Sequence, residues 1–110
     1  MVSQFKVIFT LPAQDQLDAI FIFHLGRFGR NNARRLVDEF RAVLNELKKR
    51  PRRMPQLLTP EHNFIYEYRF IYVARTYRII FRVEESEELV VIHDVRRVGI
   101  DTIIRSVETE

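Results

Sequence analysis

Arginine is the residue type in this sequence with the clearest potential for chemistry. Of 18 basic residues only Lys6, Lys48 and Lys49 are lysines, which leaves 15 arginines, and the net charge is +3. A guanidinium group can bind a phosphate or a carboxylate through two parallel hydrogen bonds. The composition therefore suggests an anionic partner, either nucleic acid or an acidic protein segment, as one of two explanations. Solvated helix faces would account for the same composition equally well.

The arginines that matter most are those in strand-like sequence between Ile65 and Arg97, because a sheet would hold them at fixed positions. A strand places alternate residues on opposite faces, and we expect these arginines to recur on a single exposed face. They are Arg69, Arg75, Arg78, Arg82, Arg96 and Arg97. We predict that Arg75, Arg78 and Arg82 bind RNA or a protein target. The alternative for Arg78 and Arg82 is a sheet-edge position, paired with Glu67 or with the acidic run 84–88.

Three runs in this stretch predict an antiparallel meander. Residues 77–83 alternate Tyr77, Ile79, Phe81 and Val83 with more polar positions, as expected of a strand with two different faces. Residues 89–95 are rich in β-branched side chains and indicate a buried strand, and residues 65–73 carry aromatic side chains on one face. The acidic run 84–88 is too polar for a core and connects two of these strands.

The segment upstream predicts the elements that cover the meander. Residues 5–10 form a short strand candidate, Thr10 is suited to cap a first helix, and glycines at 26 and 29 end that helix. Asn31 or Asn32 is expected to cap a second helix, which an apolar stripe extends to about Pro51. Residues 51–63 are expected to be a loop, and 102–107 a short final helix. The prediction is one α+β domain over residues 1–110: an N-terminal strand, an antiparallel helical hairpin, and a three-stranded antiparallel meander in one twisted sheet.

Several classes of site find no support in the sequence. There is no cysteine, hence no disulfide or thiol chemistry, and the histidines at 24, 62 and 93 are too scattered for a metal site. The three glycines form no phosphate-binding loop, and no cofactor is expected. We find neither a signal-peptide pattern nor an apolar run near the roughly 20 residues of a membrane span, so we expect a cytoplasmic protein without membrane partners.

Four short patterns occur along the chain in a characteristic order. They are Thr10-x-x-Ala13 followed by Leu17, Leu47-x-x-x-Pro51, Arg69 ahead of the run Tyr77–Val83, and Val95-Arg96-Arg97. In this order and spacing the sequence resembles the RelE/ParE superfamily of toxins from bacterial type II toxin–antitoxin modules, over nearly its whole length. The resemblance implies a small toxin, associated with growth arrest and plasmid stabilisation, that an acidic antitoxin neutralises by wrapping around it.

The superfamily contains two mechanisms, and the resemblance implies different roles for the arginines in each. RelE-like members cleave messenger RNA on the ribosome without a metal, and their phosphate-binding arginines would correspond to Arg69 and to Arg96 or Arg97. Such cleavage also needs a base and an acid. RelE-like nucleases place a Tyr or His after the last basic strand residues, whereas residues 98–104 contain neither. His93 is better explained as structural, His62 as a solvated loop residue, and Glu67 as an ion-pair partner.

This departure favours the ParE-like mechanism, in which the toxin poisons DNA gyrase without being an enzyme. The ribosome-dependent messenger RNA endoribonuclease is the alternative. A second alternative is a non-toxic module that binds an acidic peptide or RNA. In the toxin reading, the antitoxin is expected to cover apolar surface near Phe21, Phe28 or Phe40 and to pair its acidic side chains with arginines.

Overall fold

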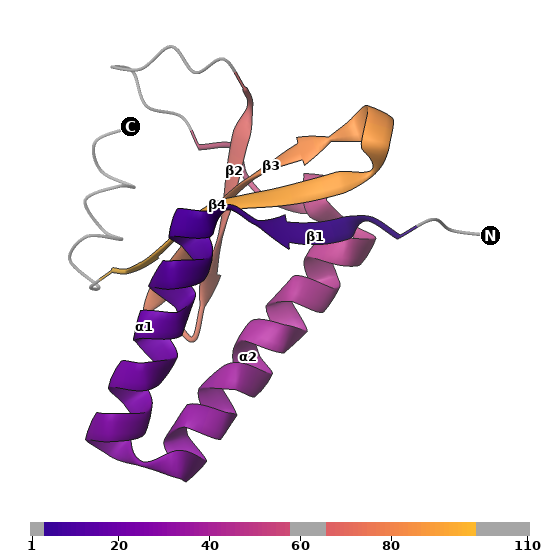
Figure 1. Ribbon diagram of the computed structural model, residues 1–110. Coiled ribbons are helices and arrows are strands. Elements are labelled where there is room, and N and C mark those ends of the chain that lie inside the picture. Colours follow the sequence, from indigo (N-terminus) through magenta and orange to yellow (C-terminus); the bar gives the residue numbers. More distant parts are fainter. Residues whose placement is uncertain (1–3, 58–65, 99–110) are drawn as a thin grey trace, which may run out of the picture.

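The computed structural model describes residues 4–57 and 66–98, and these fold into two layers (Figure 1). One layer is a sheet, and the other is a hairpin of two long helices that covers one face of it. The elements are β1 (Lys6–Phe9), α1 (Leu11–Phe28), α2 (Arg30–Lys49), β2 (Tyr68–Val73), β3 (Tyr77–Glu84) and β4 (Leu89–Arg97), with short 3-10 turns at Pro51–Arg53 and Glu85–Glu87. The predicted α+β architecture is confirmed.

The four strands are ordered β1-β4-β3-β2. β2, β3 and β4 form the predicted antiparallel meander, and β1 joins it in parallel with β4, so the sheet is mixed. The register of β3 and β4 shifts between Ile80 and Phe81: Ile80 lies opposite Asp94, whereas Phe81 lies opposite Ile92. His93 is therefore an extra residue on β4, a β-bulge that reverses the inward and outward alternation beyond it.

The core lies between the helical hairpin and one face of the sheet. Phe81, Ile79 and Ile92 from the sheet are completely buried, as are Ala13 of α1 and Leu47 of α2. Burial of a large apolar side chain contributes about 1.5–3 kcal/mol. This packing explains why the odd-numbered positions of β3 are apolar, and it confirms that the upstream helices cover one face of the meander.

The two helices are joined by a single residue, Gly29, whose φ of 90° and ψ of 176° favour glycine. Thr10 caps α1 as predicted, since its hydroxyl accepts a hydrogen bond from the Ala13 amide at 3.3 Å. The prediction that Asn31 or Asn32 caps α2 is wrong, because the helix already begins at Arg30 with Gly29 as its N-cap. The Asn32 side chain instead bonds to His24.

The predicted loop 51–63 is more ordered in its described part than the sequence indicated. Gln56 forms an antiparallel bridge with Arg69, the Leu57 amide donates to the Tyr68 carbonyl at 2.7 Å, and the Phe70 amide donates to the Pro55 carbonyl at 3.1 Å. Residues 55–57 thus cover the outer edge of β2. The predicted final helix and His62 lie outside the described residues. Neither α1 nor α2 has the length and apolar character that crossing a membrane requires.

Candidate functional site

The face of the sheet turned away from the helices, here called the open face, carries three of the six candidate arginines, Arg78, Arg82 and Arg96. The strand register places Tyr68 beside Arg82 and Tyr72 beside Arg78. Arg78 lies opposite Arg96 on the next strand. The open face therefore combines aromatic side chains from β2 with a row of arginines from β3 and β4.

Arg78 and Arg96 are the part of this face best suited to bind an anion. Like charges directly opposite each other in a sheet repel. Asp94 neutralises Arg96, whose Nε lies 2.9 Å from the carboxylate. Arg78 has no ion pair within the described residues, and its Nε is buried without a hydrogen-bond partner. That nitrogen is closed to solvent, so a carboxylate or phosphate of a partner would bind the terminal nitrogens of Arg78, which have no hydrogen bond within the described residues.

Arg82 is held in a cluster at the other end of the open face. Its Nε donates to Nε2 of His93 at 3.1 Å, it pairs with Glu84, and its guanidinium lies 4.5 Å from the centre of the Tyr66 ring. Tyr68 packs edge-on against His93, with ring centres 5.2 Å apart. Burial, and secondarily the charge of Arg82, lower the pKa of His93. His93 is therefore neutral at pH 7 and can accept the hydrogen bond from Arg82.

The three arginines predicted to be catalytic do not face one point. Arg96 is on the open face, whereas Arg69 lies beside Phe81 and Arg97 beside Tyr77, both on the side of the helices. The expectation of a single exposed face of arginines is therefore wrong for Arg69 and Arg97. The bulge at His93 explains why Arg97 lies on the side of the helices, because it reverses the alternation of faces along β4.

Arg69 has a clear structural contact. Its Nη1 donates to the Met54 carbonyl at 2.6 Å, and its Nη2 lies 3.4 Å from the carboxylate of Glu67. Arg69 thereby holds the strand-like segment near Met54 against β2. Glu67 forms an ion pair with Arg69, as expected if Glu67 is an ion-pair partner rather than a catalytic base. Arg75 is exposed in the turn between β2 and β3, where Ala74 and Arg75 have φ values of 55° and 57°.

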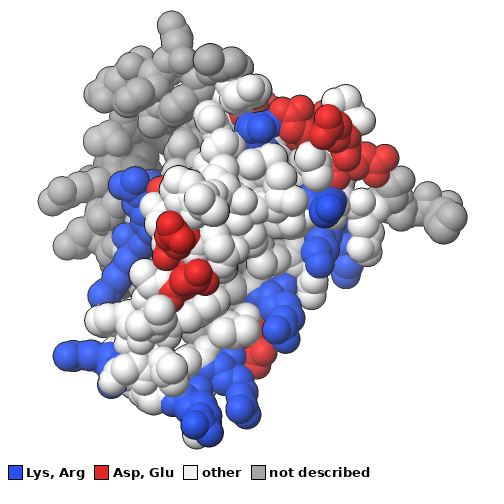
Figure 2. All heavy atoms as spheres, in the orientation of Figure 1, with Lys and Arg blue, Asp and Glu red and all other residues white. Residues whose placement is uncertain are grey.

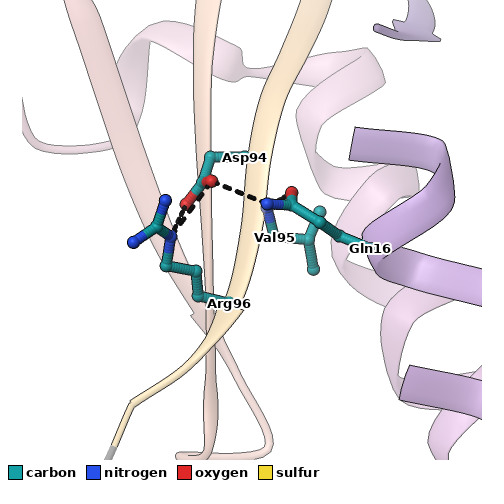
Figure 3. A network of polar contacts seen from close by, with 4 residues as sticks. All are labelled: Gln16, Asp94, Val95 and Arg96. Atoms are coloured by element: carbon teal, nitrogen blue, oxygen red, sulfur yellow. Dashed lines mark hydrogen bonds and ion pairs between the residues drawn. The ribbon is translucent and has the colours of Figure 1, made fainter. Parts of the chain in front are cut away.

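Sequence reasoning missed a network that connects α1 to the open face (Figure 3). The Gln16 amide nitrogen donates to Asp94 at 3.0 Å, and its oxygen accepts from the Val95 backbone amide at 2.8 Å. Asp94 in turn accepts from Nε of Arg96. No local pattern could have found this network, because Gln16 and Asp94 are 78 residues apart in the sequence.

A second network joins the hairpin to the sheet around Tyr77, which is buried as predicted. Nδ1 of His24 lies 2.7 Å from the Asn32 amide oxygen, and Nε2 lies 2.6 Å from the Tyr77 hydroxyl. In the neutral ring, Nδ1 donates to Asn32 and Nε2 accepts from Tyr77. Burial raises the pKa of Tyr77, and the nearby charge of Arg97 partly opposes this.

Charge is unevenly distributed over the rest of the surface. Figure 2 shows acidic side chains gathered over the connection between β3 and β4, where Glu85, Glu87 and Glu88 are exposed. Basic side chains gather around the tip of the helical hairpin. Within residues 4–57 and 66–98, no three His, Asp or Glu side chains are grouped to hold a metal ion.

The chain is a small α+β protein in which a hairpin of two helices covers one face of a four-stranded mixed sheet and the other face is basic and aromatic. Residues 7–101 match the family model of the ParE toxin of the type II toxin–antitoxin system parDE. The chain therefore belongs to this family of toxins, within the RelE/ParE superfamily that the sequence resembles.

Two solved structures share the fold. The chromosomal ParDE toxin–antitoxin system from P. aeruginosa matches with a TM-score of 0.65 at 19% identity, covering 86% of this chain and 97% of that chain. The RelBE2 toxin–antitoxin complex from Mycobacterium tuberculosis matches with a TM-score of 0.57 at 22% identity, covering 89% of this chain and 95% of that chain. No curated protein matches the sequence.

Proposed function

We propose that this toxin arrests growth by binding DNA gyrase through its open face, without cleaving nucleic acid. The observation that carries the proposal is the divergence of Arg69, Arg96 and Arg97, which point to two sides of the sheet. Cleavage of RNA requires a base, cations and an acid at one phosphate. Inhibition by binding requires only a surface of fixed shape and charge, and the open face offers one.

The open face has the composition of a protein-binding surface. Tyr and Arg are enriched among the residues that dominate binding energy at interfaces. Tyr72, Arg78 and Arg96 lie side by side on three neighbouring strands. In the proposed complex, Arg78 and Arg96 bind carboxylates of the target, and the aromatic rings of β2 supply apolar contact area.

The test combines two assays on the same purified protein. Supercoiling by DNA gyrase is measured with increasing toxin, and messenger RNA on translating ribosomes is mapped by primer extension. We expect inhibition of gyrase and no cleavage. Arg78→Ala should weaken the inhibition about tenfold or more, because a charge-assisted contact is worth roughly 1.5–3 kcal/mol. Arg27→Ala, an exposed change in the last turn of α1, is the matched control. Discrete cuts with unchanged gyrase activity would overturn the proposal.

The ribosome-dependent endoribonuclease remains the second candidate, because one observation favours it. His93 is neutral and lies next to Arg82 and Tyr68, on the same face as Arg78. A histidine and arginines on one face are the residue types that metal-independent RNA cleavage uses. If the primer-extension assay shows cuts, His93→Gln should abolish them. A protein that arrests no growth when expressed alone would instead be the non-toxic binding module.

For the cognate antitoxin, we propose a docking surface along α1. Ile22, Phe23, Leu25 and Phe28 are exposed on this helix. Arg97 borders an adjoining pocket of about 270 Å³ that is lined by Ala19, Ile20, Phe23 and Tyr77. An acidic segment with bulky apolar side chains fits both features, because its side chains would cover the helix while a carboxylate pairs with Arg97.

The earlier expectation for this contact needs one correction. Phe40 is only 2% exposed and packs in the core, where Phe21 meets it edge-on with ring centres 5.5 Å apart. Phe40 therefore cannot contact an antitoxin. The proposed surface predicts slower amide hydrogen exchange in α1 when the cognate antitoxin is bound, and equal exchange with and without antitoxin would contradict it.

A further inference from the structure

Gln16 lies where the sheet loses a strand. β1 pairs with β4 only as far as Phe9 opposite Ile92, and the Thr10 amide then bonds to the Ile92 carbonyl. β4 continues to Arg97, and no described strand pairs with it on that side beyond Ile92. The first turns of α1 run along this edge instead. There the Gln16 side chain provides the acceptor for the Val95 amide that a neighbouring strand would otherwise provide.

The Gln16 side chain also contacts a residue of the open face, Asp94. While its oxygen accepts from Val95, its nitrogen donates to Oδ1 of Asp94. Asp94 lies opposite Ile80, on the open face, and its side chain is 17% exposed. Figure 3 shows that the Asp94 carboxylate lies between Gln16 and Arg96. Gln16 therefore links a helix of the covered face to a cation on the opposite face, around the edge of the sheet.

The contact that Asp94 makes determines which part of Arg96 remains for a partner. Asp94 accepts from Nε of Arg96 at 2.9 and 3.1 Å. The two terminal nitrogens have no hydrogen bond within the described residues, and they form the half of the guanidinium group that can bind a carboxylate or phosphate. Arg96 itself is 64% exposed in its side chain, so without Asp94 it would be free to sample other rotamers.

We propose that Gln16 is a positioning residue for Arg96: by fixing the Asp94 carboxylate, it orients the guanidinium group that binds the target. The assignment of Arg96 as a target contact rests on the proposed function. An amide is the side chain that can accept from Val95 and donate to Asp94 at the same time. A carboxylate at position 16 would keep the first contact and repel Asp94.

The decisive variant is therefore Gln16→Glu, and the chain offers a matched control. Gln14 lies on the same helix and also donates to an aspartate, Asp18, at 3.0 Å, but this pair is exposed. The Arg96 Nε–H signal is followed by ¹⁵N NMR of the full-length protein, and gyrase inhibition is measured in parallel. Gln16→Glu should shift the Arg96 signal, accelerate its exchange with water and weaken inhibition about three- to tenfold. Gln14→Glu should do none of these.

A double-mutant cycle with Arg96→Ala separates positioning from a general loss of structure. If Gln16 acts through Arg96, Gln16→Glu should cause no further loss of inhibition in the Arg96→Ala background. An unchanged Arg96 signal in Gln16→Glu, or an equal loss in both backgrounds, would overturn the proposal. If Arg96→Ala itself leaves inhibition intact, the assignment of the open face to gyrase fails, and the NMR signal still decides whether Gln16 positions Arg96.

Discussion

Replacing Tyr77 by Phe tests whether the hydrogen bond between the sheet and the helical hairpin contributes to stability. Tyr77 is 3% exposed, and its hydroxyl bonds to Nε2 of His24 at 2.6 Å. Its ring packs against Phe40 and His24, with centres 5.8 Å away in both cases. Phenylalanine keeps these ring contacts and removes only the hydroxyl group. The variant therefore isolates one hydrogen bond between β3 and α1.

The expected loss in the free energy of unfolding of Tyr77→Phe depends on whether Nε2 of His24 finds another partner when the hydroxyl is removed. An average hydrogen bond contributes about 1 kcal/mol, and a buried group left without a partner costs about 1–3 kcal/mol. His24 and Tyr77 both line a pocket of about 160 Å³, whereas a water molecule occupies about 30 Å³ of liquid volume. Water can therefore replace the hydroxyl at Nε2, which places the loss near 1 kcal/mol. For a chain of this length that corresponds to a melting temperature lower by about 4 °C.

The assay is urea unfolding followed by circular dichroism, with Tyr72→Phe as the control. Tyr72 lies opposite Arg78 on the open face, and its hydroxyl has no hydrogen bond within the described residues, so its loss should cost less than about 0.5 kcal/mol. Asn32→Ala should also cost less in the Tyr77→Phe background than alone, because both act on the His24 ring. Equal effects of Tyr77→Phe and Tyr72→Phe would refute the reasoning.

Two further predictions concern Gly29 and His93. Gly29→Ala should destabilise the protein by about 1–3 kcal/mol because φ at Gly29 is 90°, whereas Gly26→Ala, inside α1, should stabilise it by about 0.5–1 kcal/mol. Both sites have open space for a Cβ atom, so the difference comes from the backbone alone. Urea midpoints that move in the same direction in the two variants would contradict this prediction. Burial and Arg82 lower the folded-state pKa of His93, so its contribution to the free energy of unfolding is complete above about pH 6.5 and declines as the pH falls through the folded-state pKa. The stability difference between wild type and His93→Gln should therefore change between pH 7.5 and pH 5.5, and a constant difference would count against the pKa assignment.

Local patterns were sufficient to predict the two long helices and the four strands that the structure describes. The alternation around Tyr77 and the apolar stripe of α2 are set by neighbouring residues, so a strand and a helix follow directly from them. The parallel pairing of β1 with β4 depends on contacts between residues 6–9 and 89–92, which no local pattern encodes. The left-handed turn at Ala74 and Arg75 was also missed, because neither residue is a type that favours positive φ.

The positions of the candidate arginines relative to the sheet followed only in part from the sequence. Alternation correctly separated Tyr77 from Arg78 and Arg82. It could not decide which of Arg96 and Arg97 lies on the open face, because one extra residue at His93 reverses the faces of the residues beyond it. Up to the bulge Val90 and Ile92 point into the core, and after it Val95 does. The position of a bulge depends on the pairing strand, so a single strand's sequence does not contain it.

The position of β4 in the sheet has a consequence for the synthesis of a toxin. β4 is a central strand, and it is also the last strand described, so β1 has no partner until residues 89–92 have been synthesised. Contacts between such distant segments form late, since the chain between them must first be ordered. The two neighbouring arginines of the open face need β4 as well, because Arg96 belongs to β4 and lies opposite Arg78 of β3. A nascent chain that ends before Arg96 therefore lacks the β4 half of the surface that we assign to the target, although it already contains the residues of the helical hairpin.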